Sequence, residues 1–170
     1  PLKLNYSKSL KRKLNKAEKN ELLLNQHLSP EAFVDFYLKN VAYKVANFEE
    51  KHKHILHRNI YKALSYQLGA IVGITNKNNE LVAANFILLH PTRIINLLPC
   101  STAEGNELNA MAYLIDHLIQ RNSNNRKIFD FEGSMIEGVA QFYKSFGAEE
   151  SKYYKLKMNL LPSFLRIFKK

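Results

Sequence analysis

Cysteine, tryptophan, glycine and proline are all scarce in this sequence, and their scarcity excludes several classes of protein. Among 170 residues there are one cysteine, no tryptophan, six glycines and five prolines. The single Cys100 cannot form a disulfide within the chain or supply a cysteine-based zinc cage. The low glycine and proline content excludes collagen-like and low-complexity chains. Since 46% of the residues are hydrophobic, the chain has enough apolar material for the core of one domain.

Long apolar runs are missing as well. No stretch approaches the roughly 20 residues that a membrane-spanning helix needs, and the longest are short pieces such as residues 86–89. The chain begins with Pro1 and shows no signal-peptide pattern, so we expect a fragment of a longer protein. Together with the single cysteine, these features favour a cytoplasmic location.

Negative charge is in the minority. Lys and Arg number 25 against 15 Asp and Glu, which gives a net charge of +10 and favours partners that carry phosphate, or anionic surfaces. Six Lys and Arg in residues 8–19 follow helical spacing beside a narrow apolar stripe of Leu10, Leu14 and Ala17. This segment predicts a basic helix, which either binds tRNA through its phosphates or simply exposes solvated lysines.

The end of the chain is both apolar and basic. Residues 160–170 mix leucine, isoleucine and phenylalanine with lysine and arginine. This composition is typical of a segment that lies on an anionic membrane, and equally of one that docks on its own domain or on a partner.

Hydrophobic periodicity and turn residues predict a mixed α/β domain. A helix begins at Ser29, Pro30 and Glu31, which have the properties of an N-cap and first turn. Further helices are expected over residues 48–67, 108–119 and 136–146, the last one opened by a capping box at Ser134 and closed by Gly147. Strands are expected over residues 70–75, 80–89, 93–98, 127–132 and 153–158, the first three as an antiparallel meander. This order predicts a central mixed sheet with helices on both faces.

One segment of this pattern resembles a known superfamily. Residues 140–148, Ala-Gln-Phe-Tyr-Lys-Ser-Phe-Gly-Ala, resemble the GNAT acyltransferase superfamily, in which a tyrosine lies four residues before the glycine that ends the penultimate helix. Tyr143 and Gly147 have this spacing. The resemblance implies a GNAT-like mixed sheet.

Within the superfamily, the sequence most resembles the Fem-type peptidoglycan bridge-forming transferases and related uncharacterised acetyltransferase-like proteins. Residues 7–19, 109–115 and above all 129–134, Phe-Asp-Phe-Glu-Gly-Ser, carry this closer resemblance. Fem-type enzymes contain two such subdomains in tandem. The resemblance therefore implies that residues 1–170 are one GNAT-like domain, the C-terminal half of a longer protein whose N-terminal subdomain is missing.

A motif that the superfamily uses is absent. GNAT enzymes bind the pyrophosphate of acetyl-coenzyme A on a glycine-containing loop whose backbone amides face the phosphates before a helix. If Gly105 takes the last position of that loop, Cys100 replaces a polar residue, Ala103 replaces the first glycine, and Glu104 adds negative charge. Fem-type enzymes use aminoacyl-tRNA and do not need this loop, so acetyl-coenzyme A and aminoacyl-tRNA both stay open as the donor.

The resemblance implies a catalytic role for Tyr143, Glu132 and Asp130. Tyr143 would protonate the leaving group, and a carboxylate at the strand end would deprotonate or orient the attacking amine. Alternation along the strand places Asp130 and Glu132 on one face, and Gly133 leaves room for a ligand. The alternative is structural: Tyr143 would be a core residue, and the carboxylates would cap a helix or pair with a lysine or arginine.

Donor binding is expected in the loop that follows the third strand. Ser101, Thr102, Gly105 and Asn106 offer hydroxyls and backbone amides to the donor, although a loop that leads into a helix uses such residues in any case. We expect the backbone amides of residues 101–105 to polarise the acyl oxygen.

Cysteine and histidine provide weaker candidates. A thiolate attacks an acyl donor only with a base beside it, and none is identifiable for Cys100, which is expected to be a small buried hydrophobe. Of His52, His54 and His57, only the last two share a helical face. No carboxylate at a diagnostic spacing completes a metal site, and we expect no metal.

These features predict an N-acyltransferase. An amine, on a small molecule or on a peptidoglycan precursor, attacks an activated acyl carbon with no covalent enzyme intermediate. The alternative is a non-catalytic half-domain that supports a missing subdomain or binds an anionic partner through residues 8–19. The altered donor loop favours this alternative, whereas the combination of residues 130–133 with Tyr143 opposes it.

Overall fold

A five-stranded sheet forms the centre of the computed structural model, which describes residues 2–41 and 50–151. The strands follow the chain order β1 to β5, and every neighbouring pair is antiparallel except β4 and β5, which are parallel. The strands are β1 (Leu23–Asn25), β2 (Gly69–Thr75), β3 (Leu81–Leu89), β4 (Arg93–Ser101) and β5 (Ile128–Asp130). The predicted mixed sheet and its central antiparallel meander are thereby confirmed.

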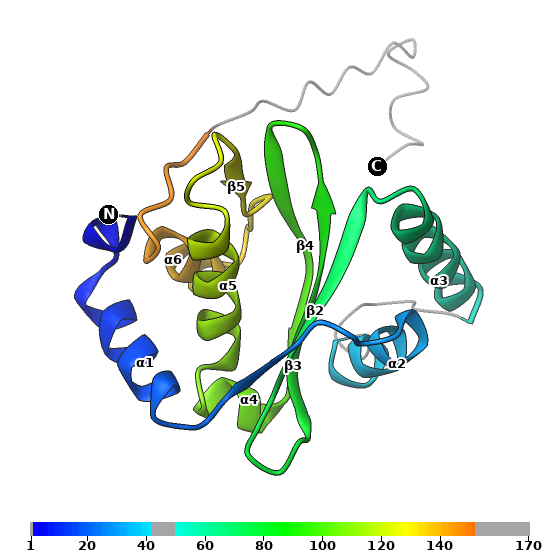
Figure 1. Ribbon diagram of the computed structural model, residues 1–170, viewed down its shortest axis with the longest axis horizontal. Coiled ribbons are helices and arrows are strands. Elements are labelled where there is room, and N and C mark those ends of the chain that lie inside the picture. Colours follow the sequence, from blue (N-terminus) through cyan, green and yellow to red (C-terminus); the bar gives the residue numbers. More distant parts are fainter. Residues whose placement is uncertain (1, 42–49, 152–170) are drawn as a thin grey trace, which may run out of the picture.

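Helices cover both faces of this sheet, also as predicted. Figure 1 shows α2 and α3 on one side, and α5 with α1 and α6 beside it on the other. The helical elements are η1 (Leu2–Asn5), α1 (Lys8–Glu18), α2 (Pro30–Asn40), α3 (Glu50–Ser65), α4 (Ala103–Glu107), α5 (Ala110–Arg121) and α6 (Glu137–Lys144). Within the described ranges, no helix is both long and apolar enough to cross a membrane.

The core has three hydrophobic layers. One lies between the sheet and α5 and includes Ile74 and Leu114, and a second lies between the sheet and helices α2 and α3 and includes Phe33 and Ile60. The third joins α1 to α5 and to the end of α6. Its buried residues are Tyr6, Leu10, Leu14, Ala112, Ile115 and Phe146.

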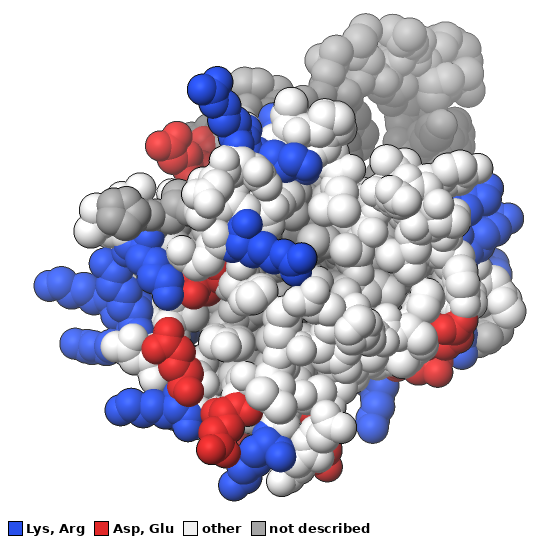
Figure 2. Space-filling view, viewed as in Figure 1, with Lys and Arg blue, Asp and Glu red and all other residues white. Residues whose placement is uncertain are grey.

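The basic helix forms as predicted, because its apolar stripe is buried in that third layer while its charges are exposed. Ser7 caps α1, its hydroxyl accepting a hydrogen bond from the Leu10 amide at 3.1 Å, and the Ser7 amide donates to the Ser145 carbonyl at 2.8 Å. Figure 2 shows Lys and Arg gathered over this edge of the molecule. The exposed cations of the segment are Lys8, Lys11, Arg12, Lys13, Lys16 and Lys19.

Two helix starts differ from the prediction. The helix expected over residues 108–119 is α5, which begins at Ala110 because Asn109 before it adopts a left-handed conformation (φ 59°), and the short helix α4 that precedes it was not predicted. The predicted capping box at Ser134 is wrong. Ile136 occupies the N-cap position without a side-chain bond, and Glu137, now the first residue of α6, accepts a hydrogen bond from Gln141 at 3.0 Å.

Strand β5 is shorter than predicted. It ends at Asp130, and Glu132 has a positive φ of 66°, so the alternation that placed Asp130 and Glu132 on one face does not extend to Glu132. Strand β1 was not predicted at all. On α3, Ile60 is buried as expected, whereas Ile55 is exposed. Phe48, the expected strand 153–158 and the segment 160–170 lie outside the described residues.

Gly105 is needed where α4 crosses β3. A β-carbon at this position would collide with the Val82 carbonyl oxygen, which belongs to the backbone and cannot swing aside. We expect Gly105→Ala to lower the free energy of unfolding by about 1–3 kcal/mol or more, measured by chemical denaturation.

Gly138→Ala is the matched control for this substitution. Gly138 lies in α6 with no atom near its missing β-carbon, so alanine should be neutral or raise stability by up to about 1 kcal/mol. Equal unfolding midpoints for the two variants would contradict the packing role of Gly105.

Candidate functional site

The sheet opens between β4 and β5. Only Arg93, Ile94 and Ile95 of β4 pair with β5, and β4 then continues to Ser101 with no strand on that side among the described residues. The register of β3 and β4 shifts at the same point, because Phe86 pairs with Leu98 while Ile87 pairs with Asn96. This bulge turns β4 away from β5. Figure 1 shows β5 beside one end of β4 only.

Tyr143 lies at the point where the two strands separate. Its hydroxyl accepts a hydrogen bond from the Asn96 side-chain amide at 3.4 Å, and its ring stacks on Phe131 with ring centres 4.7 Å apart. Asn96 is the first residue of β4 beyond the paired segment, and Phe131 is the first residue after β5. The phenol therefore contacts both sides of the opening at its narrow end.

The surroundings of Tyr143 keep its hydroxyl protonated. Burial raises the pKa of Tyr143 above its ordinary value of 10.0, and the hydrogen bond from Asn96 offsets part of that increase. At neutral pH the side chain is a phenol with a proton to donate. This is the state that a general acid requires.

Asp130 is engaged in local structure. One of its carboxylate oxygens lies 2.6 Å from the Arg93 guanidinium, and the other accepts a hydrogen bond from the Glu132 amide at 3.0 Å. The first contact joins β4 to β5 directly. It is the ion pair with a lysine or arginine that the sequence analysis gave as the structural alternative for Asp130. Glu132 itself is exposed on the loop after β5. Within residues 2–41 and 50–151, no hydrogen bond joins Glu132 to Tyr143.

The loop expected to bind the donor lies at the other end of the unpaired edge of β4. Ser101 is five residues from Asn96, about 16 Å at the rise of a strand. The amides of residues 101–105 are consequently too far from Tyr143 to polarise the same acyl group. They border the opening where β4 meets α4.

Two of the four donor-binding candidates have structural roles. The Thr102 hydroxyl caps α4 by accepting a hydrogen bond from the Gly105 amide at 2.9 Å, and it donates to the Val82 carbonyl at 3.3 Å. Gly105 is buried against that same carbonyl. Ser101 is partly exposed and Asn106 fully so, and both are accessible to a ligand.

The Glu104 carboxylate is engaged in a hydrogen bond within the protein. Its carboxylate accepts a hydrogen bond at 2.9 Å from the side-chain amide of Asn76, a buried residue that also donates to Glu80. This arrangement places the Glu104 charge toward the turn between β2 and β3.

Cys100 is buried, as the sequence predicted. Its thiol donates to the Ala84 carbonyl at 3.3 Å, and burial raises the pKa of Cys100 to about 12. The three histidines of the sequence analysis lie on α3. In the described part of the chain, no group of three histidine, cysteine or carboxylate side chains is placed to bind a metal ion.

Sequence reasoning missed Asn85. This side chain is fully buried in β3, and its amide nitrogen donates to the Asn96 carbonyl oxygen at 2.7 Å. A signal was present, since a single asparagine interrupts an apolar stretch in each of β3 and β4. A buried amide needs a partner, so such interruptions point to a polar pair.

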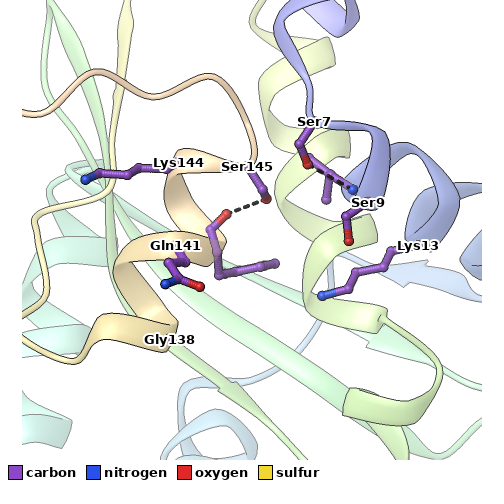
Figure 3. Close-up of a pocket in the computed structure, with 9 residues that line it drawn as sticks. Ser7, Ser9, Lys13, Gly138, Gln141, Lys144 and Ser145 are labelled. Atoms are coloured by element: carbon purple, nitrogen blue, oxygen red, sulfur yellow. Dashed lines mark hydrogen bonds between the residues drawn. The ribbon is translucent and has the colours of Figure 1, made fainter.

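A hollow with a volume of about 470 Å³ lies elsewhere, between α1 and α6. Figure 3 shows Ser9 and Lys13 of α1 facing Gln141 of α6 across it. Neither Tyr143 nor any residue of β4 lines this hollow. It is separate from the opening between β4 and β5.

Several solved structures of acetyltransferases have a fold similar to that of this chain. A possible acetyltransferase from Clostridium difficile 630 matches with a TM-score of 0.63 at 10% identity, over 84% of this chain and 98% of that chain. A predicted acetyltransferase with acetyl-CoA from Clostridium acetobutylicum gives 0.59 at 15%, over 82% and 96%. Glucosamine-6-phosphate N-acetyltransferase from Arabidopsis thaliana gives 0.56 at 10%, over 81% and 97%.

The chain therefore has the GNAT acetyltransferase fold, as the sequence predicted. No protein-family model and no curated protein matches the sequence.

The burial of Cys100 predicts low reactivity. With a pKa of about 12, almost no thiolate is present at pH 8, and the thiolate fraction should increase only as the pH approaches that value. We expect iodoacetamide to alkylate the native protein at least about 100-fold more slowly than the unfolded protein. Because Cys100 is the only cysteine, mass spectrometry reports on this residue alone. Equal rates in buffer and in denaturant would contradict its buried state.

Proposed function

We propose that the chain is an N-acyltransferase that transfers an acyl group from a coenzyme A thioester to an amine. One observation carries this proposal: the Tyr143 side chain contacts both Asn96 and Phe131. These are the first residues beyond the paired segments of β4 and β5, where the sheet opens. The fold, shared with acetyltransferases, supports it.

The unpaired edge of β4 provides the donor site. Along residues 96–101, no strand of the described structure pairs with β4 on the side away from β3, and an extended ligand with amide groups can bind there as a further strand. The acyl carbon then lies next to Tyr143 and the phosphates lie near α4. The Ser101 hydroxyl and the Asn106 side chain, both accessible, are the groups proposed to bind those phosphates.

Tyr143 is proposed as the general acid. The amine nitrogen attacks the thioester carbon, the carbonyl becomes an oxyanion, and the carbon–sulfur bond breaks as the carbonyl re-forms. The departing thiolate takes the Tyr143 proton, while the nitrogen loses its proton to a base. We assign the base to Glu132, whose exposed carboxylate lies on the loop that leaves β5. Buried Cys100 takes no part.

A Fem-type enzyme is the second candidate. It would use aminoacyl-tRNA as the donor, a peptidoglycan precursor as the acceptor, and a preceding subdomain. The observation that favours it is the exposed basic face of α1, where Lys8, Arg12, Lys16 and Lys19 form one stripe opposite the buried leucines. Such a stripe attracts nucleic-acid phosphates in a salt-dependent manner.

Ligand-dependent stability separates the donors. A ligand that binds only the folded state stabilises it by about 2.7 kcal/mol at 100 times its Kd. We expect acetyl-coenzyme A to raise the melting temperature of the protein. A rise with aminoacyl-tRNA alone would replace this proposal by the Fem-type reading, and no rise with either would favour a non-catalytic half-domain.

Tyr143→Phe should lower kcat by about 100- to 10,000-fold, because it removes the proton donor and leaves the ring that packs on Phe131. Donor binding should not change. Since burial raises the pKa of Tyr143, we expect activity to be lost through ionisation of this residue only above pH 10.0. Steady-state kinetics with acetyl-coenzyme A and a panel of amines test this expectation.

Tyr113→Phe provides the control, because it removes a hydroxyl from a residue of α5 that packs against the layer of Ile74 and Leu114, and it should leave kcat unchanged. Glu132→Gln tests the proposed base in the same assay. If the Tyr143 and Glu132 variants both retain full activity while folded, the assignment of the site is wrong.

A further inference from the structure

Asn96 determines where the proton of Tyr143 can point. The Asn96 side-chain nitrogen donates to the Tyr143 oxygen at 3.4 Å. A hydroxyl that accepts from this neighbour keeps its own hydrogen for another acceptor. If the Asn96 amide were rotated by half a turn, its oxygen would face Tyr143 and accept that hydrogen instead.

Asn85 fixes the orientation of Asn96. The Asn85 nitrogen donates to the Asn96 oxygen at 2.7 Å, and both side chains are buried. Two facing oxygens or two facing nitrogens would repel, so the two amides can rotate only together. The orientation of the Asn96 amide is therefore determined jointly with that of Asn85.

The count of unsatisfied atoms favours the observed orientation. Here the Asn85 oxygen is the buried atom left without a partner. In the rotated pair, the Asn85 nitrogen would be left instead, with two hydrogens buried and unbonded. Buried donors without partners are rarer in proteins than buried carbonyl oxygens without partners.

We propose that Asn85 and Asn96 form a relay of positioning residues that directs the Tyr143 proton into the opening between β4 and β5. This inference rests on the proposed function, since it assigns the relay to the general acid. It also gives Asn96 a second role, because its N–H donates to the phenolate that remains after the proton leaves.

Two substitutions test the relay at different points. Asn96→Asp keeps the shape and accepts from Asn85, but it presents only acceptor oxygens to Tyr143. Asn85→Leu changes a residue that does not bond to Tyr143, and it acts by removing the hydrogen bond that orients Asn96. The Asn96 oxygen can then rotate toward Tyr143 and accept a hydrogen bond from the phenol. Each change stabilises the neutral phenol and should raise the pKa of Tyr143.

The readout is a titration that needs no catalytic activity. With 3,5-difluorotyrosine at position 143 as the only fluorinated residue, fluorine NMR reports on this side chain alone, and its lower intrinsic pKa brings the titration into a range that folded proteins tolerate. We expect the midpoint to rise by about 0.5 to 1 pH unit in Asn85→Leu and by more in Asn96→Asp.

Controls separate the relay from general damage to the core. Thr75→Val removes another buried polar group, from β2, and should leave the midpoint at position 143 unchanged. The same probe at Tyr37, a second tyrosine whose pKa is raised by burial, should not respond to either asparagine substitution. Circular dichroism confirms that each variant is folded.

The kinetic expectation is a fall in kcat of about tenfold for Asn85→Leu, with an unchanged KM for the acyl donor. A midpoint that stays at the control value in both variants would overturn the relay. If the parent protein transfers no acyl group, the proposed function fails, and the fluorine titration alone decides whether the relay positions this hydroxyl.

Discussion

The short pairing of β4 with β5 is the constraint on which the rest of the site depends. Parallel strands need a crossover connection, and α4 and α5 provide it on the face opposite α2 and α3. The pairing extends over three residues of each strand, and the ion pair of Arg93 with Asp130 links the two strands there. On one side the bulge turns β4 away, and on the other the chain leaves its extended conformation before Glu132. A longer pairing would satisfy the edge of β4 and leave no place for a ligand.

The sequence was informative where the signal is local. The apolar stripe of α1, the start of α2 at Pro30, and the spacing of Tyr143 and Gly147 all depend on neighbours within one or two turns. Other features depend on partners that are distant in the chain. Asn85 and Asn96 are eleven positions apart and meet only through the register of β3 and β4. Sequence spacing does not show that register.

Wrong predictions followed from patterns that several structures satisfy. The four residues from Ser134 have the spacing of a capping box, yet the chain enters α6 two residues later and the serine bonds to Ile136 instead. Period-two alternation implied a strand through Glu132, but glutamate is not a residue type that signals a positive φ. The expectation that Thr102 and Gly105 bind the donor stays a prediction, and their contacts with Val82 show that both residues also position α4.

The helix that carries Tyr143 has no fully buried side chain of its own, so its position depends on contacts with the beginning of the chain. The Ser7 amide bonds to the Ser145 carbonyl, Tyr6 packs edge-on against Phe146, and Gly147 leaves just enough room for Asn5. A recombinant fragment trimmed to begin after Glu18 would keep the sheet and, apart from Ala17, its two inner hydrophobic layers. It would lose the contacts that support α6, and a domain boundary drawn around the sheet alone would therefore separate the sheet from Tyr143, the proposed proton donor.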